Sequence, residues 1–137
     1  MPRRLWDLKS NRVVDNDLHT QSMLYPLFWA ITHSWTNDMK PLAMTPINQY
    51  QWPIPLPGDI DLERDVRAEL LSFGAEYVWL DVLCLRQHSG TQKPNDHNST
   101  LDSMKQNEWK IDVPTIGNIY RAAERVVRYF NGLGRPF

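Results

Sequence analysis

Asp81 is the first candidate for chemistry in this sequence, because it interrupts a run of otherwise apolar and aromatic residues, Tyr77–Leu85. Burying a carboxylate costs free energy unless a partner or water satisfies it. We therefore expect Asp81 to lie at the rim of a sheet or beside a dedicated partner, and both arrangements place it near a crevice. With His33, Arg86 and Gln87 it could line a polar pocket that orients a ribose or a phosphate. A structural carboxylate that caps a backbone amide or pairs with an arginine explains it equally well.

His33 and Cys84 form a second possible pair, a base and a nucleophile on neighbouring strands. We favour the alternative, in which Cys84, the single cysteine, is a small apolar core residue. Gly132 and Gly134 follow a strand as in half of a dinucleotide-binding fingerprint, but no third glycine follows, and a plain turn explains them better. The four histidines are scattered and the cysteine has no partner at metal-ligand spacing, so we expect no metal site.

The composition is that of one ordinary domain. The 137 residues carry a formal net charge of -1, which gives no electrostatic reason to expect nucleic acid or an anionic membrane as a partner. The sequence contains no apolar run long enough for a transmembrane helix, and its N-terminus does not resemble a signal peptide. A single cysteine excludes an internal disulfide and favours a reducing compartment, so we expect a cytoplasmic protein.

Strands and helices must position these candidates. A short β-hairpin is expected at the N-terminus, followed by strands at residues 27–31, 77–85 and 126–130. The apolar run at 77–85 should be buried on both faces. Amphipathic helices are expected at residues 62–73, after the capping oxygens of Asp59 and Asp61, and from Asp112 to Ala123. Two segments remain irregular, a proline-rich insert at residues 36–58 and a polar surface loop at residues 86–108. We expect the insert to be a rigid connector, with a docking segment as the alternative.

Alternating strands and helices imply right-handed crossovers and a mostly parallel α/β sheet with flanking helices. Ligands of such sheets bind outside the carboxyl ends of the strands. Residues 33–35, 81–87 and 131–135 should all lie at that edge. The candidate ligand-binding residues are therefore His33, Trp35, Asp81, Arg86 and Gln87, and the candidates for catalysis among them are Asp81 and His33.

Three ordered segments also carry a family pattern. They are Ile31–Trp35 at the end of a strand, Tyr77–Gln87, and Ile116–Ala123 before the last strand. These segments resemble three blocks of the fungal heterokaryon-incompatibility (HET) domain: Ser-His-x-Trp-Gly, Trp-Ile-Asp-x-Leu-Cys-Ile-x-Gln and Met-x-x-Ile-Tyr-x-x-Ala. The matches cover roughly residues 3–135, although Thr36 stands where the first block usually has glycine. The insert and the Leu-Gly-Arg-Pro ending are similar to the forms found in mushroom-type fungi, the basidiomycetes.

The resemblance implies a role in fungal nonself recognition and regulated cell death. Such a signalling or effector module would act through protein partners, either like domains or upstream sensors. A further block of the family, of the Trp-Thr-x-Gln-Glu type, is not in the sequence, so we expect residues 1–137 to be the N-terminal part of a HET domain.

HET domains are also similar to Toll/interleukin-1 receptor (TIR) domains, which would make the fold distantly TIR-like or flavodoxin-like. Some TIR domains cleave NAD with a glutamate whose counterpart would lie beyond Phe137. The resemblance therefore leaves a second function open, NAD cleavage in a pocket around His33, Trp35 and Asp81. It does not decide whether the chain is an enzyme.

Overall fold

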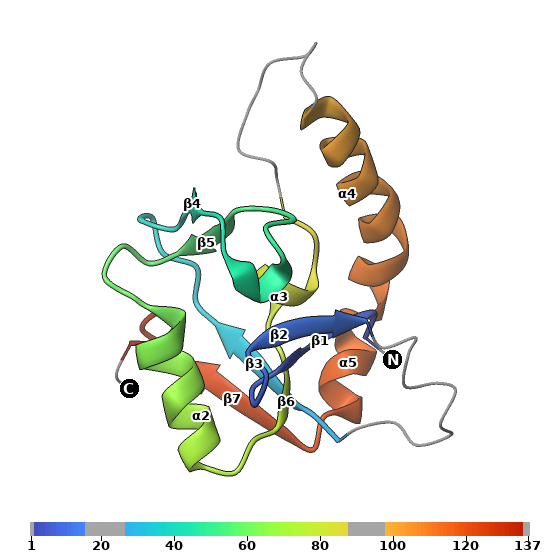
Figure 1. Ribbon diagram of the computed structural model, residues 1–137. Helices are drawn as coiled ribbons and strands as arrows, with labels where there is room; N and C mark the ends of the chain where they lie inside the picture. The colour runs from blue at the N-terminus through green and yellow to red at the C-terminus, as the bar shows by residue number, and fades with distance from the viewer. Residues whose placement is uncertain (1, 16–26, 88–97, 136–137) are drawn as a thin grey trace.

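The computed structural model describes residues 2–15, 27–87 and 98–135. Its centre is an open five-stranded sheet with the order β2-β1-β6-β3-β7 (Figure 1). Its strands are β1 (Arg4–Asp7), β2 (Arg12–Asp15), β3 (Trp29–His33), β6 (Tyr77–Trp79) and β7 (Arg125–Tyr129). The predicted α/β class and N-terminal hairpin are confirmed. The sheet is mixed rather than mostly parallel, because β3 pairs in parallel with β6 and β7 whereas the hairpin joins β6 antiparallel.

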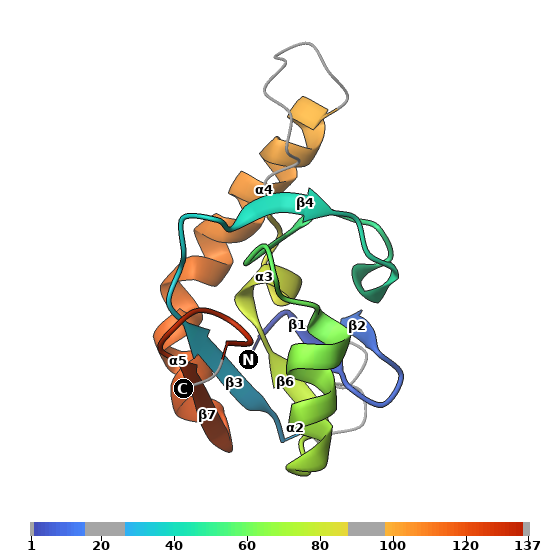
Figure 2. The ribbon, with the colours of Figure 1, turned by 90° about the vertical axis from the view of Figure 1, so that its left-hand side faces the viewer.

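Helices cover both faces of this sheet (Figure 2). On one face, a π-helical turn (η2, Leu62–Arg67) continues into α2 (Ala68–Ser72). Leu62, Val66 and Leu70 are buried there, as their helical spacing predicts. On the other face, the short 3-10 helix η3 (Val113–Thr115) leads into α5 (Ile116–Ala122).

The segment predicted as one long strand, Tyr77–Leu85, is the main correction to the sequence analysis. Strand β6 ends at Trp79, and Asp81–Cys84 forms a short helix, α3. The backbone amide of Cys84 donates to the carbonyl of Leu80 over 2.8 Å, as in a helical turn. A turn that is buried on almost all sides has the same unbroken apolar pattern as a buried strand, so periodicity cannot separate the two.

The predicted surface loop at residues 86–108 is also wrong in its second half, because α4 spans Asn98–Asp112. Residues 103–112 of this helix are mostly exposed, and the helix has no broad apolar stripe for sequence reasoning to detect. Glu108, Trp109 and Asp112 attach its last turns to the rest of the molecule, and Trp109 donates from Nε1 to the carbonyl of Arg86 over 2.6 Å. Residues 88–97 lie outside the described residues.

The proline-rich insert contains more regular structure than predicted. Strands β4 (Lys40–Ala43) and β5 (Ile54–Leu56) pair antiparallel, with the 3-10 turn η1 (Pro46–Asn48) between them. Trp52 is 2% exposed and donates from Nε1 to the carbonyl of Val82 over 3.0 Å. The insert is therefore packed against α3 through its tryptophan.

The C-terminal segment after β7 folds back over the first turn of η2. Leu133 is fully buried, and Arg135 bonds the carboxylates of Asp38 and Asp59 at 2.8 and 2.9 Å. Gly134 has a φ of 77°, and a Cβ atom there would stand 2.8 Å from Cγ2 of Ile60. Only glycine meets both conditions without strain.

We predict that Gly134→Ala lowers the free energy of unfolding by about 1–3 kcal/mol, because the added methyl group combines backbone strain with overpacking. Gly117→Ala is the matched control. A Cβ at that helical glycine meets no atom within 4 Å, so the change should be neutral or stabilising by up to about 1 kcal/mol. Chemical denaturation of the three proteins measures both effects, and equal stability of Gly134→Ala and the parent would contradict the first.

Candidate functional site

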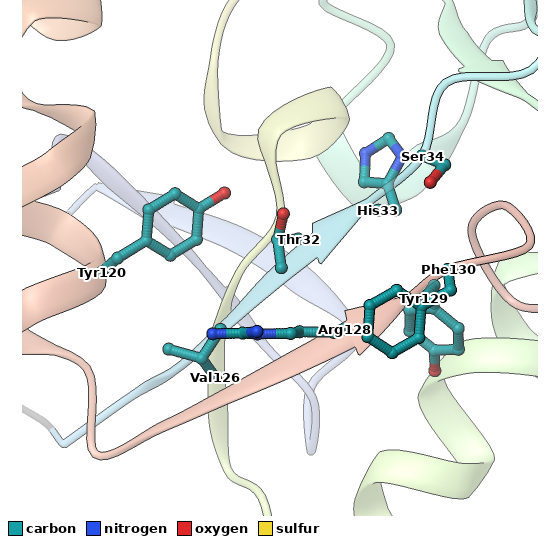
Figure 3. A pocket seen from close by; sticks show the side chains of 8 residues that line it. All are labelled: Thr32, His33, Ser34, Tyr120, Val126, Arg128, Tyr129 and Phe130. Carbon is teal, nitrogen blue, oxygen red and sulfur yellow. The ribbon is translucent and has the colours of Figure 1, made fainter. Parts of the chain in front are cut away.

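The winding of the sheet reverses at β3. From β3 the chain crosses to β6 on one side and later returns to β7 on the other. In open α/β sheets, ligands bind outside the carboxyl ends of the strands at such a reversal. A pocket of about 480 Å³ opens at this place, here called the β3–β7 pocket (Figure 3). Its lining residues are Thr32, His33, Ser34, Tyr120, Val126, Arg128, Tyr129 and Phe130.

His33 and Asp81 meet beside this pocket. The distance from Nε2 of His33 to Oδ1 of Asp81 is 2.7 Å, and the two side chains are 1% and 21% exposed. His33 ends β3, whereas Asp81 begins α3 directly after β6, the parallel neighbour of β3. Asp81 was expected either at the rim of the sheet or beside a dedicated partner, and the structure gives it a partner, His33.

The carboxylate also determines the state of the imidazole. Asp81 Oδ1 accepts a second hydrogen bond from the amide of Val82 at 2.8 Å, which fixes its position. Burial disfavours the charged form of His33, but the hydrogen bond and the negative charge of Asp81 outweigh burial and raise the pKa of His33 above its ordinary value. A carboxylate only accepts hydrogen bonds, so Nε2 of His33 carries a proton and donates a hydrogen bond to Asp81. The other ring nitrogen, Nδ1, is buried and has no hydrogen-bond partner among the described residues. The ring must become more exposed before it can exchange a proton with a ligand.

Trp35 and Gln87, two further predicted ligand-binding residues, lie near this pair but differ in what they can contact. Trp35 is 57% exposed, and its ring centroid is 5.3 Å from that of His33. Gln87 turns inward and donates from Nε2 to the carbonyls of Asp81 and Leu85 at 3.1 and 2.9 Å. Trp35 is thus available to a ligand, whereas Gln87 closes the helical turn that carries Asp81.

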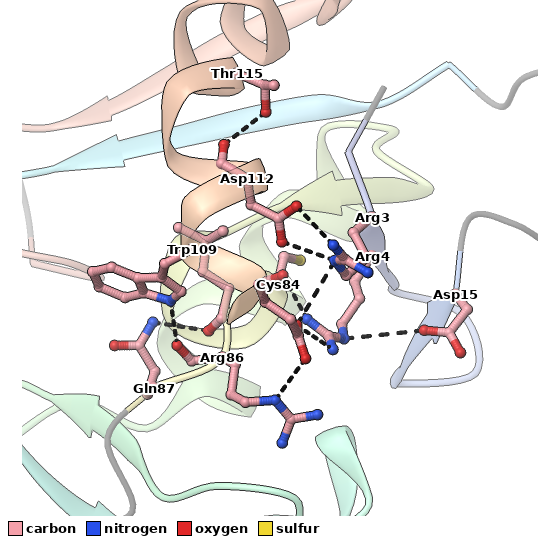
Figure 4. Close-up of polar contacts among 11 residues, drawn as sticks. Arg3, Arg4, Asp15, Cys84, Arg86, Gln87, Trp109, Asp112 and Thr115 are labelled. Atoms are coloured by element: carbon pink, nitrogen blue, oxygen red, sulfur yellow. Dashed lines mark hydrogen bonds and ion pairs between the residues drawn. The ribbon is translucent and has the colours of Figure 1, made fainter. Parts of the chain in front are cut away.

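The structure does not bring Arg86 to the β3–β7 pocket. Its Nε bonds Glu108 at 2.8 Å, and Glu108 also lies 2.7 Å from Nη2 of Arg4 (Figure 4). The guanidinium groups of Arg4 and Arg86 each lie 5.1 Å from the ring centroid of Trp52. We call Arg4, Arg86, Glu108 and Trp52 the arginine–tryptophan cluster. Its contacts join β1, the chain after α3, the insert and α4, which is a structural role.

Sequence reasoning missed most of the residues that line the pocket, among them Tyr120 and Arg128. Arg128 is the register partner of Thr32 across the β3–β7 pairing, so both side chains lie on the same face. Tyr120 reaches in from α5 and packs edge-on against Trp79 at 5.7 Å. Burial raises the pKa of its hydroxyl, and the charge of Asp81 adds to this effect. Arg128 is placed in the pocket by the register of the β3–β7 pairing, and no pattern in the sequence predicts that register.

The remaining candidates for chemistry were the thiol of Cys84 and a metal site. Cys84 is buried, burial raises the pKa of its thiol to about 12, and its Sγ lies 3.8 Å from the carbonyl oxygen of Val78. Such a thiol is a core residue rather than a nucleophile. Among the described residues, no group of three histidine, cysteine or carboxylate side chains could hold a metal ion.

We predict that the stability of the protein falls as the pH rises through the pKa of His33. The pKa in the folded state is raised above the ordinary 6.5, so protonation favours folding. The stability that protonation of His33 contributes is complete below about pH 6.5, the pKa in the unfolded chain. It is lost as the pH rises through the higher pKa of the folded state. In Asp81→Asn, His33 stays buried but loses the carboxylate that raises its pKa. The fall in stability with rising pH should therefore disappear or change sign. Denaturation at pH 6 and pH 9 measures it, and the same pH dependence in both proteins would refute the assignment.

We predict that Glu108→Gln destabilises the protein by about 3 kcal/mol. The change removes the ion pair of Arg86 and leaves Arg4 with only one ion pair among the described residues, its 4.0 Å contact with the exposed Asp15. Arg4 and Arg86 have side chains only 8% and 9% exposed. Glu76→Gln is the control, since Glu76 pairs with Lys9 on the surface and its loss should cost less than about 1 kcal/mol. Urea denaturation compares the two variants, and similar small losses in both would show that the arginine–tryptophan cluster contributes little.

Comparison with known proteins adds no identity to this picture. No protein-family model matches the chain, and neither curated proteins nor solved structures gave a match. Within the described part of the chain, no helix is both long and apolar enough to cross a membrane. The function therefore has to be inferred from the residues around the β3–β7 pocket.

Proposed function

We propose that this protein is a HET-type signalling or effector module of fungal nonself recognition and regulated cell death, acting in the cytoplasm through protein partners. One observation carries the proposal. The three sequence segments that resemble HET blocks are far apart in the chain, yet they meet at one place. Ile31–Trp35 contributes the end of β3, Tyr77–Gln87 contributes Asp81, and Ile116–Ala123 contributes Tyr120.

The geometry of the site favours a binding module over an enzyme. The imidazole of His33 is buried and engaged with Asp81, so it is not placed to take a proton from a ligand. No carboxylate belongs to the described residues that line the β3–β7 pocket. A ligand bound there would act by stabilising one arrangement of β3, α3 and α5, which a partner domain could then recognise.

NAD cleavage is the second candidate, and the exposed Trp35 beside the His33–Asp81 pair favours it. An aromatic ring that is 57% exposed offers a stacking surface for a nicotinamide or an adenine. If the imidazole turned outward, the pair could assist hydrolysis of the glycosidic bond. A TIR-like or flavodoxin-like fold belongs to this proposal and remains a prediction.

Inducible expression in a filamentous fungus tests the main proposal. We expect the parent chain to kill cells, measured by uptake of a vital dye, and Asp81→Asn to lose this effect at equal protein level. Glu76→Gln is the matched control, because it makes the same carboxylate-to-amide change just before β6, at the opposite end of that strand from Asp81. Cell death unaffected by Asp81→Asn would overturn the role of the site.

Nicotinamide release from NAD by the purified protein separates the two candidates. A binding module gives no turnover at high protein concentration, whereas the enzyme gives turnover that Asp81→Asn abolishes and Glu76→Gln preserves. Thermal unfolding of each variant, followed by circular dichroism, ensures that a folded protein is compared. Turnover by the parent would replace the module with the enzyme.

A further inference from the structure

We propose that the β3–β7 pocket binds a nucleotide and that Arg128 is the residue that contacts its phosphates. This inference rests on the proposed function in one respect only, namely that the same pocket receives a ligand. It goes further than the signalling module because it names the chemical class of the ligand. It goes further than NAD cleavage because it assigns a phosphate-binding residue outside the His33–Asp81 pair and requires no turnover.

The first support is the charge of the pocket. Arg128 lies along its floor on β7, and it forms no ion pair among the described residues (Figure 3). The nearby carboxylate of Asp81 is occupied by His33 at 2.7 Å and by the amide of Val82 at 2.8 Å. The described residues that line the pocket include no acidic side chain. The pocket therefore presents an uncompensated positive charge, which favours an anion.

The second support is the set of hydroxyl groups around this guanidinium. Thr32 stands opposite Arg128 in the parallel pairing. The hydroxyl of Tyr120 points toward Thr32 from α5, but it already donates a hydrogen bond to the carbonyl of Ile31 over 3.4 Å. Ser34 follows at the end of β3 and also lines the pocket. A guanidinium donates a planar fork of N–H groups that matches phosphate oxygens, and the hydroxyls of Thr32 and Ser34 can donate to the remaining oxygens. A carboxylate or a sulfate uses fewer of these donors than a diphosphate.

The third support is the aromatic surface at the same edge. Phe130 lines the pocket and is 68% exposed, which is costly for a phenyl ring that has no partner. Trp35, 57% exposed, lies just beyond Ser34. A base stacked on one of these rings would bury it while the phosphates reach Arg128. Phosphate and an aromatic ring together are the features of a nucleotide.

The test is isothermal titration calorimetry of the full chain with ADP, adenosine and pyrophosphate. We expect ADP to bind more tightly than either of the other two probes. Arg128→Gln should weaken ADP binding by about 10-fold to 100-fold, the loss expected for a charge-assisted hydrogen bond, and should leave adenosine binding unchanged. Phe130→Ala should weaken ADP and leave pyrophosphate unchanged.

Arg125→Gln is the matched control for charge. It removes the same charge from the same strand, but its guanidinium lies 5.5 Å from the ring centroid of Trp29, away from the pocket. ADP affinity should stay within about twofold, and thermal unfolding of each variant verifies the fold. The proposal would be overturned if Arg125→Gln and Arg128→Gln lost ADP affinity equally, or if no probe bound. It would also be overturned if adenosine or pyrophosphate bound as tightly as ADP. These outcomes are independent of the cell-death assay, so either proposal can fail alone.

Discussion

The hydrogen bond between His33 and Asp81 is the interaction on which the functional edge of this protein depends. It joins the last residue of β3 to the first residue of α3, and it compensates a carboxylate that would otherwise be costly so close to the core. The same oxygen receives the amide of Val82, so one carboxylate fixes both the imidazole and the start of the helix. A parallel pairing makes this geometry possible, because adjacent parallel strands end at the same edge.

A second polar assembly, the arginine–tryptophan cluster, fixes the other side of α3. Glu108 compensates two buried arginines, and both guanidinium groups lie 5.1 Å from the ring centroid of Trp52, whose indole donates to the carbonyl of Val82. The short helix α3 is thus held through Asp81 on one side and through the cluster on the other. A helix of four residues has too few internal hydrogen bonds to be stable alone, so these tertiary contacts must supply its stability.

These two assemblies divide the polar residues of the site into those that support and those that can bind. The support consists of Asp81, Gln87 and Arg86, which are half-buried or buried. Asp81 bonds His33, Gln87 donates to the backbone carbonyl of Asp81, and Arg86 pairs with Glu108. Arg128 and Trp35 keep exposed surface at the edge of the sheet. A rigid support with exposed contact groups is the arrangement that preorganises a ligand site. This division is why we propose ligand recognition by the exposed residues rather than proton transfer by the buried pair.

Local sequence patterns were sufficient to predict the α/β class, the hairpin, the burial of Leu62, Val66 and Leu70 in the 62–73 helix, and the need of Asp81 for a partner or a place at the rim. Each of these depends on local periodicity or on the cost of burying a charge, which are properties of neighbouring residues. Contacts between distant segments fix three other features: Tyr77–Leu85 divides into a strand and a helical turn, Arg86 faces Glu108 instead of the pocket, and Arg128 stands opposite Thr32. The physical reason is that strand register and the direction of a buried turn are fixed by partners distant in the chain, and an apolar run carries no record of them.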